Sequence, residues 1–353
     1  MTGIRRVSQL GTTGESTYVD GSIQAVDIAA NAVTQDKLST DVPLSGMRNV
    51  LINGDMNIWQ RSTSVAIATL GYTADRWYHQ SYNGAVISQQ PTSDSTRLPS
   101  TRYCARVLRN TGATAVNFMY FTQSMETSQS VKLAGQTATL SFWARAGAGI
   151  TSSTFTASII YGTGTDQNVI AGYTGQATAF TNNVTLTTTW QKFTSTGAVP
   201  TTATEVAFVC GYTPVGTAPA NDYFEITNVQ LEVGPQPTPF EQRPIGMELA
   251  LCQRYYYQLQ EGGFNRLGVV PAATTSREAP FFFPVTMRAT PTVTITGGTV
   301  YMFSTSVSHT PSSTTATGLT PQGGFQISSG MAAGTAGATC ALDAFLIKAS
   351  AEL

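Results

Sequence analysis

The chain has 353 residues, a formal net charge of −1 at pH 7 and only 11% charged residues, against about 25% in an average soluble domain. It has no basic stripe and no apolar run near the roughly 18 residues of a membrane-spanning helix, so neither a nucleic-acid partner nor membrane insertion is expected. Residues 1–16 lack the apolar segment of a secretory signal peptide, so export by that route is not expected either. The length suits about two domains, and the abundance of hydroxyl and amide side chains favours an assembled β-protein over a helical enzyme.

The N-terminal region contains an apolar ladder with a step of five residues. Its members are Tyr18, Ile23, Ile28, Val33 and Leu38. Five residues advance an α-helix by about 140° and move a strand to its opposite face, so no single straight element gathers these side chains on one side. Identical copies wrapped around a common axis could bury them. We therefore predict an N-terminal arm over 1–45 for oligomerisation, as a homotrimer, and for docking.

Residues 46–240 predict one large β-domain. Leu140 and Phe142 alternate with Trp143 and Arg145, so an apolar face lies opposite a polar, aromatic one. Many short strands at this spacing are typical of a sandwich or jelly roll. The predicted strands include 106–109, 137–144, 155–161, 185–193, 205–212 and 223–233.

The rest of the chain predicts a helical connector and a second β-domain. The connector, 241–262, follows a proline-rich extended stretch and contains one helix, predicted over 244–259. Residues 263–353 predict a smaller C-terminal β-sandwich, in which the polar tract 304–317 is a loop. The predicted fold class is therefore mainly β, with an extended arm, a jelly-roll sandwich, a short connecting helix and a smaller β-sandwich.

Few residues suggest catalysis or metal binding. The two histidines, His79 and His309, belong to no catalytic motif, and His79 is expected to be exposed on a strand. Because no catalytic motif is present, we expect no enzymatic activity. No pair of cysteines has the CxxC spacing of a zinc site, so we expect buried free thiols and no metal site. The four cysteines are Cys104, Cys210, Cys252 and Cys340.

Aromatic residues beside polar ones suggest glycan binding, because a flat ring can stack on a sugar while amides and charged groups bind its hydroxyls. Trp143 with Arg145 fits best, since both lie on the polar face of their strand. Most tryptophans of a β-sandwich are core residues, which is the competing interpretation. The candidate glycan-binding residues are Trp143, Arg145, Tyr161, Tyr212 and Trp77.

Several stretches resemble known families. LINGDMNIWQR (51–61) with YTADRW (72–77) resembles the opening of a domain common in tail-fibre proteins of tailed bacteriophages, and 224–244 resembles its last strand and exit. The stretch 21–38 is similar to repeats of phage fibre shafts. The run LSFWAR (140–145) is similar to jelly-roll carbohydrate-binding modules.

The resemblance to carbohydrate-binding modules implies an aromatic-lined groove on the concave sheet, with Trp143 and Tyr161 as its matching residues. It also implies a structural calcium ion in many members. Where such modules end their last strand with Asp-Asp, this chain has Thr227-Asn228, which departs from that pattern. We therefore expect no cofactor beyond, at most, that calcium ion.

Together these features predict a bacteriophage fibre or spike subunit, assembled in the host cytoplasm and located in the virion. Its arm would bind other virion structural proteins, and its β-domains would bind host surface polysaccharide. One alternative is a purely structural decoration of the head, neck or tail. A less favoured alternative is a polysaccharide depolymerase, in which two scattered carboxylates meet in space.

The ladder makes a specific prediction. Ile28→Asp places a charge among side chains that oligomerisation would bury, so assembly or docking should fail while the β-domains stay folded. Sedimentation of the full-length protein, with circular dichroism as the folding check, measures both effects. A wild-type chain that sediments as a monomer would contradict the predicted trimer.

Overall fold

The computed structural model describes residues 46–353 except 69, 82–83, 93, 261–265, 272–274 and 333. The predicted arm and its ladder residues, Tyr18, Ile23, Ile28, Val33 and Leu38, lie outside the described residues. The described part is mainly β, as predicted, and its helices are α1 (Thr127–Ser130) and α2 (Ile245–Gln253). None of these helices is long and apolar enough to cross a membrane.

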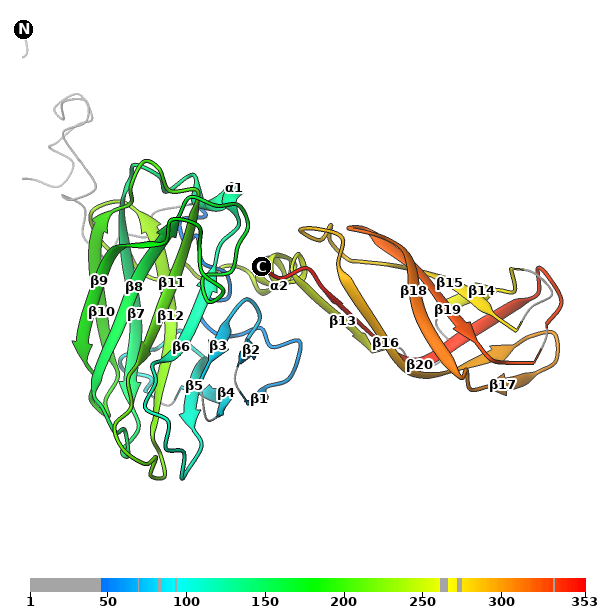
Figure 1. Cartoon of the computed structure of the whole chain (residues 1–353), viewed down its shortest axis with the longest axis horizontal. Coiled ribbons are helices and arrows are strands. Elements are labelled where there is room, and N and C mark those ends of the chain that lie inside the picture. The colour runs from blue at the N-terminus through cyan, green and yellow to red at the C-terminus, as the bar shows by residue number, and fades with distance from the viewer. Residues whose placement is uncertain are drawn as a thin grey trace, which may run out of the picture.

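The first unit is a sandwich of two antiparallel sheets with six strands each. Sheet A contains, in spatial order, β1 (Ser64–Ile67), β4 (Ala85–Pro91), β5 (Tyr103–Arg109), β12 (Tyr223–Val233), β7 (Thr137–Ala146) and β10 (Gln191–Ala198). Sheet B contains β2 (Leu70–Tyr72), β3 (Tyr78–Gln80), β6 (Met119–Ser124), β11 (Glu205–Tyr212), β8 (Thr154–Gly162) and β9 (Ala177–Thr185). Figure 1 shows the two sheets stacked face to face.

The strand order identifies a jelly roll. Among β5 to β12, sheet A has the order β5-β12-β7-β10 and sheet B has the order β6-β11-β8-β9. Consecutive strands therefore alternate between the sheets, except for the β8–β9 hairpin, which is the connectivity of two Greek keys. The predicted jelly-roll sandwich is confirmed.

The core lies between the two sheets and is rich in aromatic rings. In β7 the predicted alternation is confirmed, because Leu140 and Phe142 are fully buried against sheet B. Trp77 stacks on Phe121 with ring centroids 4.9 Å apart, and Phe208 meets Trp77 edge-on at 5.8 Å. Truncating a buried ring of this kind to Ala typically costs about 3–5 kcal/mol.

Some local predictions for the sandwich were wrong. Residues 185–193 are not one strand, because β9 ends at Thr185, β10 begins at Gln191 and the chain turns between them. The β-branched residues of that stretch resemble a strand, but tertiary pairing decides where a strand ends. His79 was predicted to be exposed, but it is buried in β3, where burial lowers the pKa of its ring to about 3.

The second unit, predicted as a smaller β-sandwich, is built on one eight-stranded sheet, sheet C, in which β16 and β18, near opposite ends of the strand path, contact each other. Its path is β17 (Val307–His309), β16 (Thr292–Met302), β20 (Thr339–Ser350), β14 (Arg266–Val269), β15 (Arg277–Phe282), β19 (Gly323–Ser329) and β18 (Ser313–Thr320), and β13 (Tyr256–Gln260) also pairs with β20. Its core includes Phe281, Phe345 and Ile347.

Two local predictions fail in this unit. The tract 304–317, predicted as a loop, carries β17 and most of β18, whose burial alternates between exposed and partly buried side chains. A polar, threonine-rich edge strand needs few apolar residues, so its sequence resembles a loop. The helix predicted over 244–259 ends at Gln253, because β13 pairs with β20 from Tyr256 onward.

A junction of arginines and aromatic rings connects the two units, and α2 and the C-terminus lie between them (Figure 1). The guanidinium of Arg76, which is 2% exposed, stacks 3.5 Å from the centroid of Tyr255 and pairs with Glu352. Arg61 also pairs with Glu352, at 3.0 Å, and covers the ring of Tyr256. The sandwich thus supplies the cations, and the residues that follow it supply the rings and the carboxylate.

The stretches that resemble phage-fibre domains, 51–61 and 72–77, build this junction. The side-chain amide of Asn53 donates to the carbonyls of Ile58 at 2.9 Å and Asp75 at 3.1 Å, so it joins the two stretches. Trp77 Nε1 donates to the Asn53 carbonyl at 2.9 Å. This interlocked turn presents Arg61 and Arg76 to Glu352.

The junction predicts a large effect of losing one carboxylate. Glu352→Ala leaves the buried Arg76 charge without its anionic partner, which should lower the free energy of unfolding by about 3 kcal/mol. Denaturant unfolding followed by fluorescence measures this loss. The matched control is Lys348→Ala, an exposed charge on β20, which should change stability by less than about 0.5 kcal/mol. Equal effects of the two substitutions would contradict the proposed importance of the ion pair.

Candidate functional site

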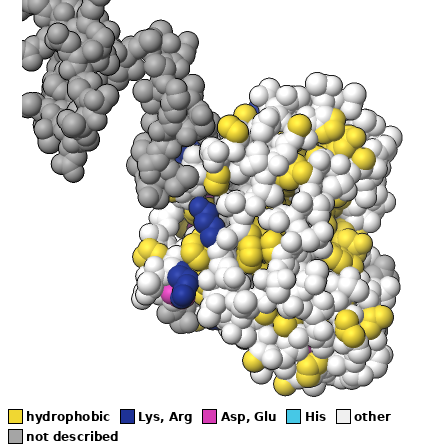
Figure 2. Space-filling view, turned by 90° about the vertical axis from the view of Figure 1, so that its left-hand side faces the viewer, with side chains coloured by type: hydrophobic (Ala, Val, Ile, Leu, Met, Phe, Trp, Pro, Cys, Tyr) yellow, Lys and Arg dark blue, Asp and Glu magenta, His cyan; other side chains and the backbone are white. Residues whose placement is uncertain are grey.

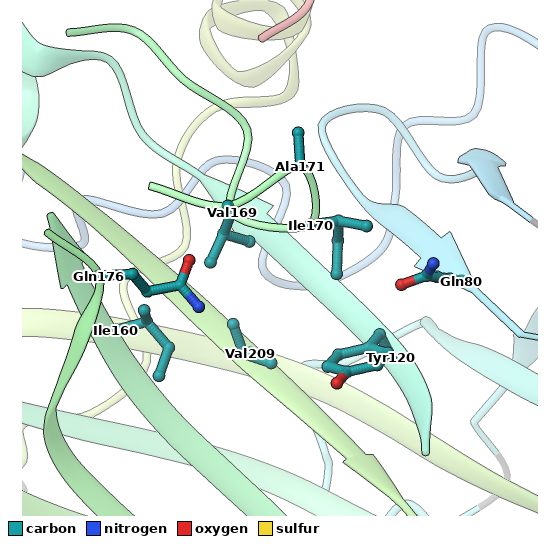
Figure 3. Close-up of a pocket in the computed structure, with 9 residues that line it drawn as sticks. Gln80, Tyr120, Ile160, Val169, Ile170, Ala171, Gln176 and Val209 are labelled. Carbon is teal, nitrogen blue, oxygen red and sulfur yellow. The ribbon is translucent and has the colours of Figure 1, made fainter. Parts of the chain in front are cut away.

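A pocket of about 430 Å³ lies on the outer face of sheet B, beneath the loop 163–176 (Figure 3). The sheet supplies its floor, and the loop supplies its cover. The floor residues are Gln80 from β3, Tyr120 from β6, Val209 from β11 and Ile160 from β8. The cover residues are Val169, Ile170, Ala171, Gly172 and Gln176.

Strand alternation places the floor residues outside the core. Met119 and Phe121 are buried in the sandwich, so Tyr120 between them faces outward. Register then brings Gln80 opposite Tyr120, and Gly211 of β11 follows on the other side. A Cβ at Gly211 would lie 1.9 Å from the Met119 carbonyl oxygen and 2.8 Å from the ring of Phe118, so glycine is needed at this position.

The pocket has polar groups at its ends and apolar groups in its middle. In Figure 3, Gln80 and Tyr120 lie together at one end and Gln176 lies near the other, with Val209 between them. Phe118 packs against Tyr120 with centroids 4.7 Å apart, which extends the aromatic end. A ligand with apolar C–H faces and many hydroxyls would match this distribution.

The outer face of sheet B beyond the pocket is also uncharged. Thr156 donates to Asn183 at 2.9 Å, and the hydroxyls of Ser158 and Thr181 lie 2.9 Å apart. These pairs lie on β8 and β9 in the same cross-strand rows as the floor of the pocket. Figure 2 shows a whole face of the molecule on which charged side chains are similarly few. The site is therefore suited to a neutral, hydroxyl-rich ligand.

Contacts at both ends hold the covering loop in place. The backbone N–H of Gln167 donates to the buried carboxylate of Glu205 at 2.5 Å, and that of Val169 donates to Ser124 Oγ at 3.0 Å. From the second unit, Arg288 pairs with Asp166 at 3.1 Å. The side chain of Asn168 donates to the Leu353 carbonyl at 3.1 Å. The position of the cover therefore depends on the sandwich and on the second unit.

Two of the predicted glycan-binding residues are corrected by their burial. Trp77 and Tyr212 are both fully buried, so neither can contact a sugar. Tyr212 instead donates its hydroxyl to Asp222 at 2.8 Å. In β11 the residues that share a face with Tyr212 pack into the core, so the face predicted for binding is the inner one.

The other three predicted residues keep some exposure. Tyr161 is partly buried and packs on the core, and it does not line the pocket. Trp143 and Arg145 do lie together, on the outer face of sheet A, with Trp143 packed against Leu98 and Trp190. Trp143 and Arg145 thus share an exposed surface, as predicted, but that surface belongs to sheet A, whereas the pocket lies on sheet B.

The pocket residues were largely missed. Tyr120 lies in the run MYFTQS, where apolar residues on both sides of the strand hide the alternation. Gln80, three residues after Trp77, is the last residue of β3, a strand of only three residues in which alternation is hard to recognise. Ile170 reaches the pocket through loop closure, for which the sequence has no local signal.

The described residues contain no group of three or more His, Cys, Asp or Glu side chains that could hold a metal ion. Thr227 and Asn228 stand where this chain departs from the Asp-Asp pattern of the calcium-binding modules. Thr227 Oγ1 donates to the Tyr103 carbonyl at 2.8 Å, and Asn228 Nδ2 donates to Thr101 Oγ1 at 2.6 Å. All four cysteines are buried, as predicted, and burial raises the pKa of the Cys210 thiol.

These features define the first unit as a jelly-roll sandwich with an uncharged, aromatic-ended pocket on one sheet. No protein-family model matches the sequence, and no curated protein matches it. One similar solved structure is described as "CBM4 structure and function", with 21% identity, a TM-score of 0.33, and coverage of 52% of this chain and 98% of that one.

Two more solved structures are similar. Tailspike protein 4 of bacteriophage CBA120, in its enzymatically active domain, is 15% identical with a TM-score of 0.34, and the match covers 53% of this chain and 21% of that one. The C-terminal family 22 carbohydrate-binding module of Clostridium thermocellum Xyn10B is 14% identical with a TM-score of 0.33, covering 48% and 91%. Scores this low carry no argument about function, which is therefore inferred from the site itself.

The anchoring of the loop makes a testable prediction. Glu205→Ala removes the acceptor of the Gln167 N–H, so amide exchange across 163–176 should accelerate about tenfold. Hydrogen exchange with mass spectrometry measures this rate. Glu205→Gln keeps an acceptor oxygen at the same place and should exchange close to the wild-type rate. Unchanged exchange in Glu205→Ala would show that other contacts hold the loop.

Proposed function

We propose that the pocket on sheet B binds a neutral polysaccharide of a host cell surface. The observation that carries this proposal is the combination of an aromatic and aliphatic floor with amide groups at both ends and no charged lining residue. The apolar face of a sugar ring would stack on Tyr120 and pack on Val209. Gln80 and Gln176 would exchange hydrogen bonds with its hydroxyls.

Binding by one copy is expected to be weak. The floor offers one large ring, and the cover offers short aliphatic side chains, so a dissociation constant on the order of 0.1 mM per site is reasonable. The extended outer face, with Thr156 and Asn183, would add contacts for further sugar units of the same chain. Several copies in one assembly would multiply such affinities by avidity.

The proposed setting is a bacteriophage fibre located in the virion, without enzymatic activity. The support is the N-terminal ladder, which suits a homotrimer, together with the fibre-like stretches at 21–38, 51–61 and 72–77. In this setting the arm docks to other virion proteins and the sandwich contacts the host. A purely structural subunit would have the same fold and arm but no sugar binding.

The experiment compares two tyrosines on opposite faces of the sandwich. Full-length protein is applied to an array of neutral host polysaccharides, and hits are measured by calorimetry. Tyr120→Ala should weaken binding about tenfold, equivalent to about 1.4 kcal/mol, because the stacking ring is lost. Tyr223→Ala, on the outer face of sheet A, should bind neutral glycan as the wild type does.

Two results would overturn the proposal. One is the absence of binding to any neutral polysaccharide, which would favour the purely structural alternative. The other is equal binding by wild type and Tyr120→Ala, which would place the site elsewhere. Release of reducing ends during incubation would contradict the absence of enzymatic activity.

A further inference from the structure

The outer face of sheet A gathers positive charge in an otherwise sparsely charged chain. In one cross-strand row, Arg106 of β5, Glu225 of β12 and Arg145 of β7 lie side by side. In the next row, Trp143 lies beside Lys192 of β10. Three cations and one carboxylate give this face a net positive charge. The lining of the sheet B pocket, by contrast, contains no charged residue.

The two arginines are held by a fully buried carboxylate. Glu225 Oε1 accepts hydrogen bonds from Arg106 Nε at 2.8 Å and Nη2 at 2.6 Å, and its Oε2 accepts one from Arg145 Nε at 2.5 Å. Glu225 is 0% exposed, but the side chains of Arg106 and Arg145 remain 26% and 23% exposed. Within the part of the chain that the structure describes, Nη1 of Arg106 and both Nη groups of Arg145 make no hydrogen bond.

Aromatic rings fix the planes of the guanidinium groups. Arg106 lies 4.2 Å from the ring centroid of Tyr223, and Arg145 lies 5.1 Å from that of Trp190. Trp190 is buried under Leu98 of the neighbouring loop, so its ring cannot move aside. The donors are therefore preorganised, which reduces the entropy that a ligand must overcome.

Nearby acidic groups do not cancel this charge. The single negative charge of Glu225 can neutralise only one of the two positive charges of Arg106 and Arg145. In the loop that carries Leu98, Asp94 is already paired with Arg97 at 2.9 Å. Lys192 is exposed, and its side chain makes no hydrogen bond or ion pair with the described residues. The uncompensated charge is available to a ligand.

We propose that this face, defined by Arg106, Arg145, Trp143, Tyr223 and Lys192, is a second binding site for an acidic polysaccharide. Its anionic groups, either carboxylates or sulfate and phosphate esters, would accept hydrogen bonds from the free Nη groups. Trp143 and Tyr223 would pack against the sugar rings that carry them. This site is separate from the sheet B pocket and does not depend on neutral glycan binding.

The experiment measures binding of full-length protein to four probes by biolayer interferometry at two salt concentrations. Polygalacturonate carries carboxylates, dextran sulfate carries sulfates, dextran is the neutral control, and single-stranded DNA tests for unspecific attraction. Wild type should bind at least one acidic polysaccharide at least tenfold more tightly than dextran or DNA. Binding should weaken as salt rises. The preferred probe distinguishes the two sources of anion.

Variants test the assignment to this face. Arg145→Gln should weaken acidic binding at least tenfold, and Lys192→Gln about threefold, because Lys192 is more exposed. Lys132→Gln, an exposed lysine after α1, and Tyr120→Ala, in the sheet B pocket, should both bind as wild type does. If Arg145→Gln fails to fold because Glu225 loses a partner, the comparison of acidic-polysaccharide binding by Lys192→Gln and Lys132→Gln tests the proposal instead. Lys192 does not contact Glu225, so its substitution should leave the fold intact.

Three outcomes would overturn the proposal: no binding to either acidic polysaccharide, equal binding by Lys192→Gln and Lys132→Gln, or DNA binding as tight as acidic-polysaccharide binding. A Tyr120→Ala variant that loses neutral binding but keeps acidic binding would support both sites independently. Loss of both by Tyr120→Ala would contradict the separation of the two faces.

Discussion

The burial of the Arg76 guanidinium is the constraint on which the arrangement of the two units depends. A buried charge costs several kcal/mol unless it is paired and hydrogen-bonded. Arg76 meets this requirement with groups from three parts of the chain, namely the Ser124 carbonyl at 2.6 Å, the ring of Tyr255 and the carboxylate of Glu352. The end of α2 and the end of β20 must therefore meet at the turn before β3, which orients sheet C against the sandwich.

The same junction reaches the pocket through the covering loop. Arg288 of the second unit bonds to Asp166 and also donates to the Ala351 carbonyl at 2.8 Å. Tyr72 and Asn168 donate to the Leu353 carbonyl at 3.0 and 3.1 Å. Ile170, which belongs to the cover, lies four residues after Asp166 and two after Asn168. The second unit thus supports the wall of a pocket that lies wholly in the first.

Strand alternation predicted more of the fold than of the site. It placed Leu140 and Phe142 in the core and Trp143 with Arg145 outside it, because only one side of β7 is strongly apolar. In β11 both sides are apolar, since Ala207 and Val209 are covered by the loop, so the sequence does not show which side faces the other sheet. The prediction for Tyr212 failed for this reason. Pocket closure by Ile170 depends on pairings distant in sequence, which local patterns do not encode.

The motif that most resembled a phage-fibre domain also has a different role from the one its aromatic residues suggested. Trp77 was a candidate sugar contact, but its ring packs on Phe121 and its Nε1 holds the turn at Asn53. Trp77 therefore belongs to the core, which is formed by the inner faces of the two sheets. The outer faces remain available for ligands. The two proposed sites lie on these opposite faces, so a glycan chain at one would not compete sterically with a chain at the other. Assembly through the arm would then multiply two different weak affinities at once.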